Sequence, residues 1–220
     1  NLKMKKHLLV VIALVALVGI TFSQAQKTVL FENWTSSTCG PCASNNPQLK
    51  VWIQNNWNAL ICVSYHVGWP SPGNDPMYLA NPTESYDRRY YYGINSVPAA
   101  KMEGLYSYVG SPFNFSSMTG NYNYYTGLSA NTSVTVTDTR IAGDSIRAVV
   151  NVTKFSELPA GTYTLRVMAV ERWVVYNSPP GTNGETIFGN VFRKSLPSVS
   201  GTPITITPGN ESYTFTYYRD

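Results

Sequence analysis

The chain has 220 residues and a net charge of +4, and three of its 16 basic residues lie within the first 25 positions. Without those 25 residues, 13 basic side chains stand against 12 acidic ones, and only two pairs of basic residues are adjacent. A nucleic-acid surface needs clustered Lys and Arg, so the composition gives no support to that class of partner and none is expected.

The first 25 residues have the pattern of a secretory signal peptide. Lys5 and Lys6 form a positive n-region, an apolar run covers residues 8–22, and residues 23–25 place small side chains where a signal peptidase cuts. The apolar run is shorter than the roughly 20 residues of a membrane span, which makes an uncleaved anchor the less favoured alternative. We therefore expect export, cleavage after Ala25, and a compartment that permits disulfides.

Residues 26–130 mix strand and helix signals. A short apolar run at 28–31 predicts a buried strand, and apolar residues at helical spacing predict an amphipathic helix over 41–57. A continuous apolar run at 59–63 is typical of a strand covered on both faces, as in a parallel sheet. The later signals predict, in order, a helix over 81–92, a strand over 99–103, a hairpin partner at 106–109 and a helix over 111–125.

Residues 131–220 read as a succession of strands. The strand candidates are 132–137, 146–152, 162–175, 204–206 and 213–217. Short strands joined by Gly and Pro turns indicate an all-β antiparallel sandwich. The strand-like run at the C-terminus leaves open whether this domain is complete, and no group of residues in it is suited to catalysis.

A CxxC motif, Cys39-Gly40-Pro41-Cys42, lies between the first predicted strand and the predicted helix. In this context the motif indicates a redox-active dithiol. Cys39 is expected at the helix N-terminus, where free N–H groups favour the thiolate that attacks disulfides. Cys42, one turn further in, is expected to be more buried and to resolve the mixed disulfide. Gly40 and Pro41 shape the turn that holds the two sulfurs at bonding distance.

Two other readings of the motif are less favoured. A purely structural disulfide would close a very small loop, and such a loop contributes little through chain entropy. A zinc site would need Cys62 and His66 as further ligands, but their spacing fits no common zinc motif. We expect Cys62 to be a small buried hydrophobe, and His66 to be a polar loop residue and a candidate auxiliary residue near the site. No metal ligands are assigned.

The order of these elements around the CxxC motif resembles the thioredoxin fold over residues 28–127. More narrowly, the chain resembles a Bacteroidetes outer-membrane-protein family with a thioredoxin-like front half and a β-sandwich back half. The residues that carry the narrower resemblance are Glu32, Thr35, the CxxC motif, His66, Asp75-Pro76, Gly93 to Pro98, Glu171-Arg172 and Asn190 to Arg193. The resemblance implies a signal peptide (1–25), an α/β thioredoxin-like domain (26–130) and a β-sandwich domain (131–220).

The resemblance also implies roles around the dithiol. Pro98 is expected to follow a cis peptide bond and to pack against the sulfurs, leaving the backbone of Val97 free to pair with an extended substrate. The chain departs from the thioredoxin pattern at two positions: Thr38 replaces a Trp before the first cysteine, and Asn33 replaces a buried acid that assists proton transfer. Glu32 is a candidate auxiliary acid, but neighbouring strand residues point to opposite faces.

Together these observations predict an exported thiol–disulfide oxidoreductase in the periplasm, or at the outer membrane or cell surface, of a Gram-negative bacterium. Its expected partners are other exported proteins that carry thiols or disulfides, and outer-membrane association is a further expectation. No cofactor is expected besides the Cys39–Cys42 disulfide itself. The alternative is an envelope binding or structural protein whose disulfide is idle.

Overall fold

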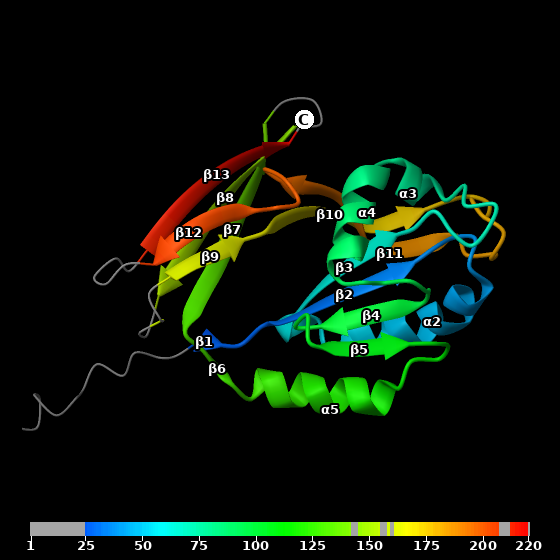
Figure 1. Ribbon diagram of the computed structural model, residues 1–220, viewed down its shortest axis with the longest axis horizontal. Helices are drawn as coiled ribbons and strands as arrows, with labels where there is room; N and C mark the ends of the chain where they lie inside the picture. The colour runs from blue at the N-terminus through cyan, green and yellow to red at the C-terminus, as the bar shows by residue number, and fades with distance from the viewer. Residues whose placement is uncertain (1–24, 142–144, 155–157, 159–160, 207–211, 220) are drawn as a thin grey trace, which may run out of the picture.

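The computed structural model describes residues 25–141, 145–154, 158, 161–206 and 212–219, so the predicted signal peptide lies outside the described residues except for Ala25. The protein is mixed α/β, with more strand than helix. Figure 1 shows an elongated molecule, with a sheet covered by helices at one end and smaller sheets at the other. The short strands β1 (Ala25–Gln26) and β6 (Ser129–Ala130) pair antiparallel where the two parts meet.

Four strands of the first half form the middle and one edge of a six-stranded sheet. They are β2 (Val29–Thr35), β3 (Leu60–His66), β4 (Ala99–Met102) and β5 (Tyr106–Val109). β2 and β3 run parallel, whereas β4 runs antiparallel to both β2 and β5. The strands and the hairpin predicted for this half are confirmed, and β2 and β3 each continue several residues beyond their apolar runs.

Helices cover both faces of this sheet (Figure 1). One face carries α2 (Gly40–Asn55) and α5 (Phe115–Thr126), and the other carries α3 (Pro76–Leu79) and α4 (Pro82–Tyr91); a single 3-10 turn, η1 (Trp57–Ala59), leads into β3. β2 alternates between the faces: Phe31 packs against Trp52 of α2, whereas Trp34 stacks on Tyr65 in a separate core cluster. The sequence missed α3 because only four residues form it.

Two strands of the second half complete the six-stranded sheet. β10 (Val167–Val175) and β11 (Ile187–Leu196) form an antiparallel hairpin, and β11 lies parallel to β3, so that the order is β10-β11-β3-β2-β4-β5. The expectation that every strand after residue 130 belongs to a sandwich is therefore wrong for this hairpin, and no strand was predicted at β11. The reason is long-range packing: Phe192 lies 4.7 Å from the Tyr65 ring, a contact that local periodicity does not reveal.

The remaining strands form a sandwich-like unit. β7 (Thr132–Arg140), β8 (Ile146–Lys154) and β13 (Ser212–Arg219) make one antiparallel sheet, and β9 (Gly161–Leu165) pairs with β12 (Thr202–Ile206). Val152, Ile204 and Phe215 pack together between these sheets. The single strand predicted over 162–175 is in fact two strands, β9 and β10, that belong to different sheets.

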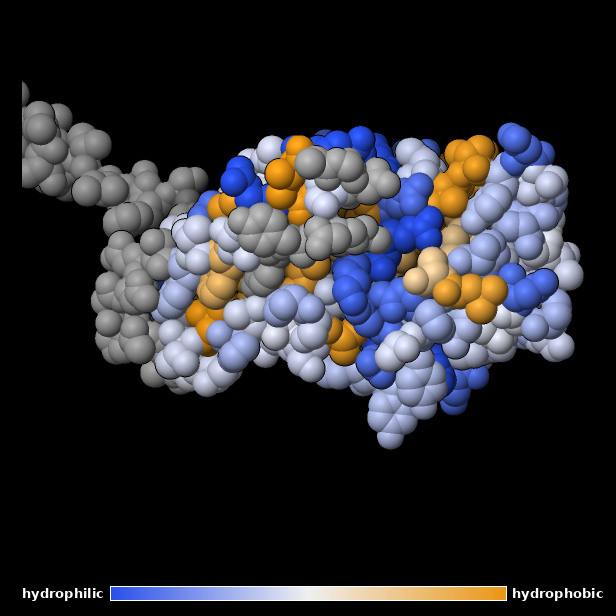
Figure 2. All heavy atoms as spheres, turned by 90° about the horizontal axis from the view of Figure 1, so that it is seen from above, coloured by the Kyte–Doolittle hydropathy of each residue, from blue (hydrophilic) through white to orange (hydrophobic). Residues whose placement is uncertain are grey.

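The surface seen from above is mixed in polarity. In Figure 2 the apolar atoms of this face form separate patches, and a strongly hydrophilic band lies between them over the middle of the molecule. Within the described part of the chain, no helix has both the length and the apolar character needed to cross a bilayer.

Candidate active site

Cys39 and Cys42 form a disulfide at the start of α2, with the sulfurs 2.07 Å apart and the Cα atoms 5.2 Å apart. Cys39 is the N-cap residue of the helix, and its Sγ accepts a hydrogen bond of 3.1 Å from the backbone N–H of Cys42. Gly40 and the helix-starting Pro41 are exposed in the first turn. Helix N-termini stabilise negative charge, so this position suits a thiolate on Cys39 once the disulfide is reduced.

Val97 lies beside the sulfur of Cys39 and is followed by Pro98. The carbonyl oxygen of Val97 is 3.8 Å from Sγ of Cys39, and the peptide bond between Val97 and Pro98 is cis. Pro98 is buried and directly precedes β4, whereas Val97 is half-buried. The fold therefore brings the Val97 carbonyl to Cys39, whereas packing of Pro98 against the sulfurs stays a prediction.

Both cysteines are buried, Cys39 at 1% exposure and Cys42 at 0%. The sequence predicted greater burial for Cys42 but did not foresee a covered Cys39. Residues 177–184, within the segment that joins β10 to β11, contact the backbone of the CxxC turn, and we call them the strap. Asn183 of the strap donates three hydrogen bonds to this turn. Its backbone N–H donates to Ser37 O at 2.9 Å, and its Nδ2 donates to the carbonyl oxygens of Ser36 and Cys39 at 3.0 and 3.3 Å.

The strap approaches the turn so closely that only glycine fits at one position. A Cβ atom added to Gly181 would lie 2.2 Å from the carbonyl oxygen of Ser37, which is well inside van der Waals contact. A second segment reaches the same turn from the other direction, because the Thr38 hydroxyl donates to the carbonyl oxygen of Pro70 at 2.9 Å. Thr38, which replaces the expected Trp, therefore holds a covering loop.

His66 is the last residue of β3 and is 2% exposed, so it is a core residue and not the polar loop residue that the sequence predicted. Its Nδ1 lies 2.6 Å from Oδ2 of Asp75, and the same oxygen accepts the N–H of Ser37 at 2.6 Å. Burial opposes ionisation of Asp75, but the hydrogen bonds from His66, Ser37 and Tyr78 outweigh it and hold the pKa of this carboxyl below its usual value. His66 is thereby connected to the CxxC turn through one carboxylate.

Glu32 points to the opposite face of the sheet, as the alternation of strand residues predicted. It is fully buried and forms a bidentate ion pair with Arg88, with N–O distances of 2.8 and 2.9 Å. The hydroxyls of Tyr65 and Tyr92 also donate to this carboxylate, at 3.1 and 2.7 Å. Burial and the Glu32 charge raise the pKa of both phenols. This satisfied network lies away from the disulfide.

Asn33 lies on the α2 side of β2 and is buried. Its Oδ1 accepts from the Ser64 hydroxyl at 2.9 Å and lies 3.8 Å from Sγ of Cys62. Burial raises the pKa of the Cys62 thiol to about 12, which keeps this thiol protonated and unreactive. Among the described residues, no three His, Cys, Asp or Glu side chains converge as metal ligands.

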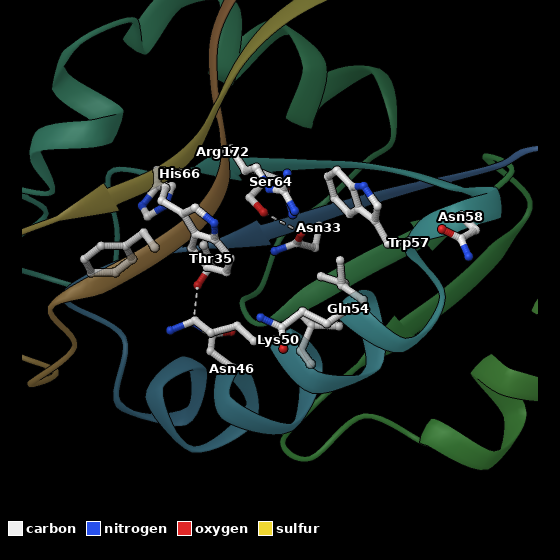
Figure 3. A pocket seen from close by; sticks show the side chains of 16 residues that line it. Asn33, Thr35, Asn46, Lys50, Gln54, Trp57, Asn58, Ser64, His66 and Arg172 are labelled. Atoms are coloured by element: carbon white, nitrogen blue, oxygen red, sulfur yellow. Dashed lines mark hydrogen bonds between the residues drawn. The ribbon is translucent and has the colours of Figure 1, made fainter.

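A pocket of about 320 Å³, which the sequence did not predict, opens beside α2. Figure 3 shows Thr35, Ser64 and His66 on the strand side, facing Asn46 and Lys50 of the helix. Its remaining wall comes from the β10–β11 hairpin, with Arg172, Trp173, Phe188, Gly189 and Asn190. Arg172 and Asn190 belong to the motifs that carry the family resemblance, but only the placement of the hairpin beside β3 brings them to this pocket.

Comparisons with known proteins bear on the fold alone. No model of a protein family matches the chain. No curated protein matches it either. Two solved structures are similar. HBP35 of Porphyromonas gingivalis, a Bacteroidetes protein, matches with a TM-score of 0.68 and 15% identity over 88% of this chain. A structural-genomics protein of Agrobacterium tumefaciens matches with a TM-score of 0.55 and 17% identity over 89% of this chain. The match covers 64% of the HBP35 chain and 79% of the second. The chain thus shares its mixed α/β fold with a Bacteroidetes protein.

Proposed function

We propose that the protein is an exported thiol–disulfide oxidoreductase with a thioredoxin-like first half, in which Cys39 attacks and Cys42 resolves. The observation that carries this proposal is the position of Cys39 as the N-cap of α2, with the Cys42 N–H donating to its sulfur at 3.1 Å. Such a donor lowers the free energy of the thiolate and leaves the thiol less affected. The nearby carbonyl of Val97 supports a second part of the proposal, pairing with the backbone of an extended substrate.

The reaction exchanges two electrons without a cofactor. In the reduced protein, the Cys39 thiolate attacks one sulfur of a substrate disulfide, so that a mixed disulfide forms and the other substrate sulfur leaves as a thiolate. Cys42 then loses its proton and attacks Sγ of Cys39, which releases the second substrate thiol. The protein ends as the Cys39–Cys42 disulfide and the substrate as a dithiol; the reverse sequence oxidises a substrate.

Two features of the site shape this proposed reaction. Asn33 occupies the place of the buried acid of thioredoxins, so the proton of Cys42 must leave through another group or water. The strap is hydrogen-bonded to the CxxC turn, so we expect a protein substrate to displace residues 177–184 before exchange. We expect exchange to be slower than in a protein with an open CxxC turn.

Trapping of a mixed disulfide tests the proposal. Cys42→Ser removes the resolving thiol, so a peptide with one internal disulfide should remain covalently attached through Cys39, and mass spectrometry under non-reducing conditions measures the adduct. Cys39→Ser is the matched control and should give far less adduct, because Cys42 lies inside α2 and lacks the N-cap position that favours a thiolate on Cys39. Equal adducts from the two variants would contradict the assigned roles.

The reduction potential, measured by equilibration with glutathione, then gives the direction of electron flow. A value near about −270 mV, as in thioredoxin, would indicate a reductant, and a value near about −120 mV would indicate an oxidant.

A second candidate function is an envelope binding or structural protein with an idle disulfide. The burial of both cysteines favours it, because a reactive thiol must be accessible. Here neither glutathione nor the disulfide peptide should exchange with the protein over hours, even after Cys42→Ser.

A further inference from the structure

The pocket beside α2 is separate from the disulfide, because neither Cys39 nor Cys42 lines it. Its volume, about 320 Å³, lies at the lower end of the range for small-molecule sites, roughly 300–1,000 Å³. Its floor is buried, and its rim carries Trp57 and Trp173, each 41% exposed. The pocket is therefore open to solvent at an aromatic rim, as a site for a planar ligand would be.

The charges that line the pocket have one sign. Lys50 and Arg172 line it, and no Asp or Glu does. Lys50 is partly neutralised by Glu185, 3.6 Å away, but no carboxylate in the described part of the chain pairs with Arg172. The guanidinium of Arg172 instead lies 4.6 Å from the ring centroid of Trp57, with its charge available to a ligand. Such a lining favours an anion, and a carboxylate matches the planar guanidinium.

A buried polar atom in the floor points to a second feature of the ligand. Nε2 of His66 is buried and has no hydrogen-bond partner among the described residues, and His66 lines the pocket. Nδ1 of His66 donates a hydrogen bond to the Asp75 carboxylate. In the neutral ring the other nitrogen, Nε2, is therefore a hydrogen-bond acceptor. An unsatisfied buried polar atom destabilises the free protein, and a ligand hydroxyl or N–H that donates to it would remove that cost.

From these three features we propose that the pocket binds a small aromatic carboxylate that also carries a hydroxyl or N–H donor. The carboxylate pairs with Arg172, the ring lies against the tryptophans of the rim, and the donor reaches Nε2 of His66. The contacts are non-covalent, and the proposal does not depend on the redox activity of the disulfide.

Calorimetric titration of the purified protein with 4-hydroxyphenylacetate tests the proposal. Two analogues each remove one ligand group: phenylacetate lacks the donor, and 4-hydroxyphenylethanol lacks the charge. Each should bind about tenfold or more weakly, the effect of losing one good hydrogen bond. Equal binding of all three compounds, or no saturable binding up to about 1 mM, would overturn the proposal.

A variant and an internal control locate the binding. Arg172→Gln should weaken 4-hydroxyphenylacetate about tenfold, whereas Arg140→Gln, an exposed arginine on β7 outside the pocket, should leave the affinity unchanged. In NMR spectra the indole N–H signals of Trp57 and Trp173 should shift on binding, whereas that of Trp34, on the other face of the sheet, should not. Unchanged affinity in Arg172→Gln, or a shift of Trp34 alone, would rule the pocket out.

Discussion

The two faces of the six-stranded sheet each bury an ionisable side chain, and these two side chains differ in how completely they are hydrogen-bonded. On the α4 face, the Glu32 carboxylate receives donors from Arg88, Tyr65 and Tyr92. On the α2 face, His66 has one nitrogen bound to Asp75, and the other has no partner in the part of the chain that the structure describes. The Glu32 carboxylate is thus fully satisfied, whereas the face with His66 carries the disulfide and the pocket.

This difference separates stability from chemistry within a single sheet. A buried ion pair whose acceptors are all filled can only lose stability when one partner is removed. A buried nitrogen without a hydrogen-bond partner can gain one when a ligand binds. The open pocket beside His66 gives a ligand access to this nitrogen. We therefore expect mutations on the α4 face to change stability, and mutations on the α2 face to change reactivity and binding as well.

The largest expected effect is on the α4 face. Arg88→Met leaves Glu32 as an uncompensated buried charge, which should cost about 3–5 kcal/mol in the free energy of unfolding, measured by urea denaturation. Arg140→Met on the exposed strand β7 is the control and should cost about 0.5 kcal/mol or less. If Arg88→Met remained folded, its rate of disulfide reduction by dithiothreitol should equal that of the wild type. A faster rate would mean that the ion pair on one face affects access to the disulfide on the other.

The next effect connects the faces to pH. Asp75→Asn removes the charge that accepts from His66 and Ser37, with an expected loss of about 1.5–3 kcal/mol at pH 7. Because the folded pKa of Asp75 lies below its unfolded value of about 3.9, its stabilisation is complete above that value and is lost as the pH falls through the folded pKa.

The difference in unfolding free energy between Asp75→Asn and the wild type should therefore be constant from neutral pH down to about pH 5 and shrink below about pH 4. Denaturation curves across this range measure it. A difference that stays constant into the acid range would show that the Asp75 charge does not stabilise the turn.

The smallest effect on stability, and the most specific for reactivity, is expected in the strap. Asn183→Ala removes the side-chain donor to Ser36 and Cys39, which should cost the strap about 1–2 kcal/mol. The open population, and with it the rate of disulfide reduction by dithiothreitol, should rise about 5- to 30-fold. The control is Thr182→Ala, which changes an exposed side chain next to Asn183. The disulfide of this variant should be reduced at the wild-type rate. Equal rates in all three proteins would mean that the strap does not limit access.

Local signals in the sequence predicted most elements of the first half. Asn81 accepts the N–H of Glu84 and Pro82 begins the helix, as their order in the sequence indicated for α4. Such caps and apolar periods act over a few residues, so a single sequence reveals them. The same applies to the CxxC motif, because the residues around it predict that a helix starts there.

Pairing between distant segments was beyond reach from the sequence. β9 and β10 form one continuous strand-like run, but a change of partner at Arg166 places them in separate sheets. β11 showed no strand pattern because several of its residues are buried on both faces and others are charged. Its neighbour β3 is more than 100 residues away in the chain, and only packing selects it.

The sequence by itself predicted the local placement of the candidate site: two cysteines at a helix start, followed by a proline before a hairpin. Tertiary structure alone decided what those sulfurs meet. The sheet order and the loops that packing selects bring in the strap that bonds to the Cys39 carbonyl, the carboxylate that holds His66 and the arginine that lines the pocket. Local spacing specifies which elements form, whereas burial of surface between distant segments specifies which side chains become neighbours.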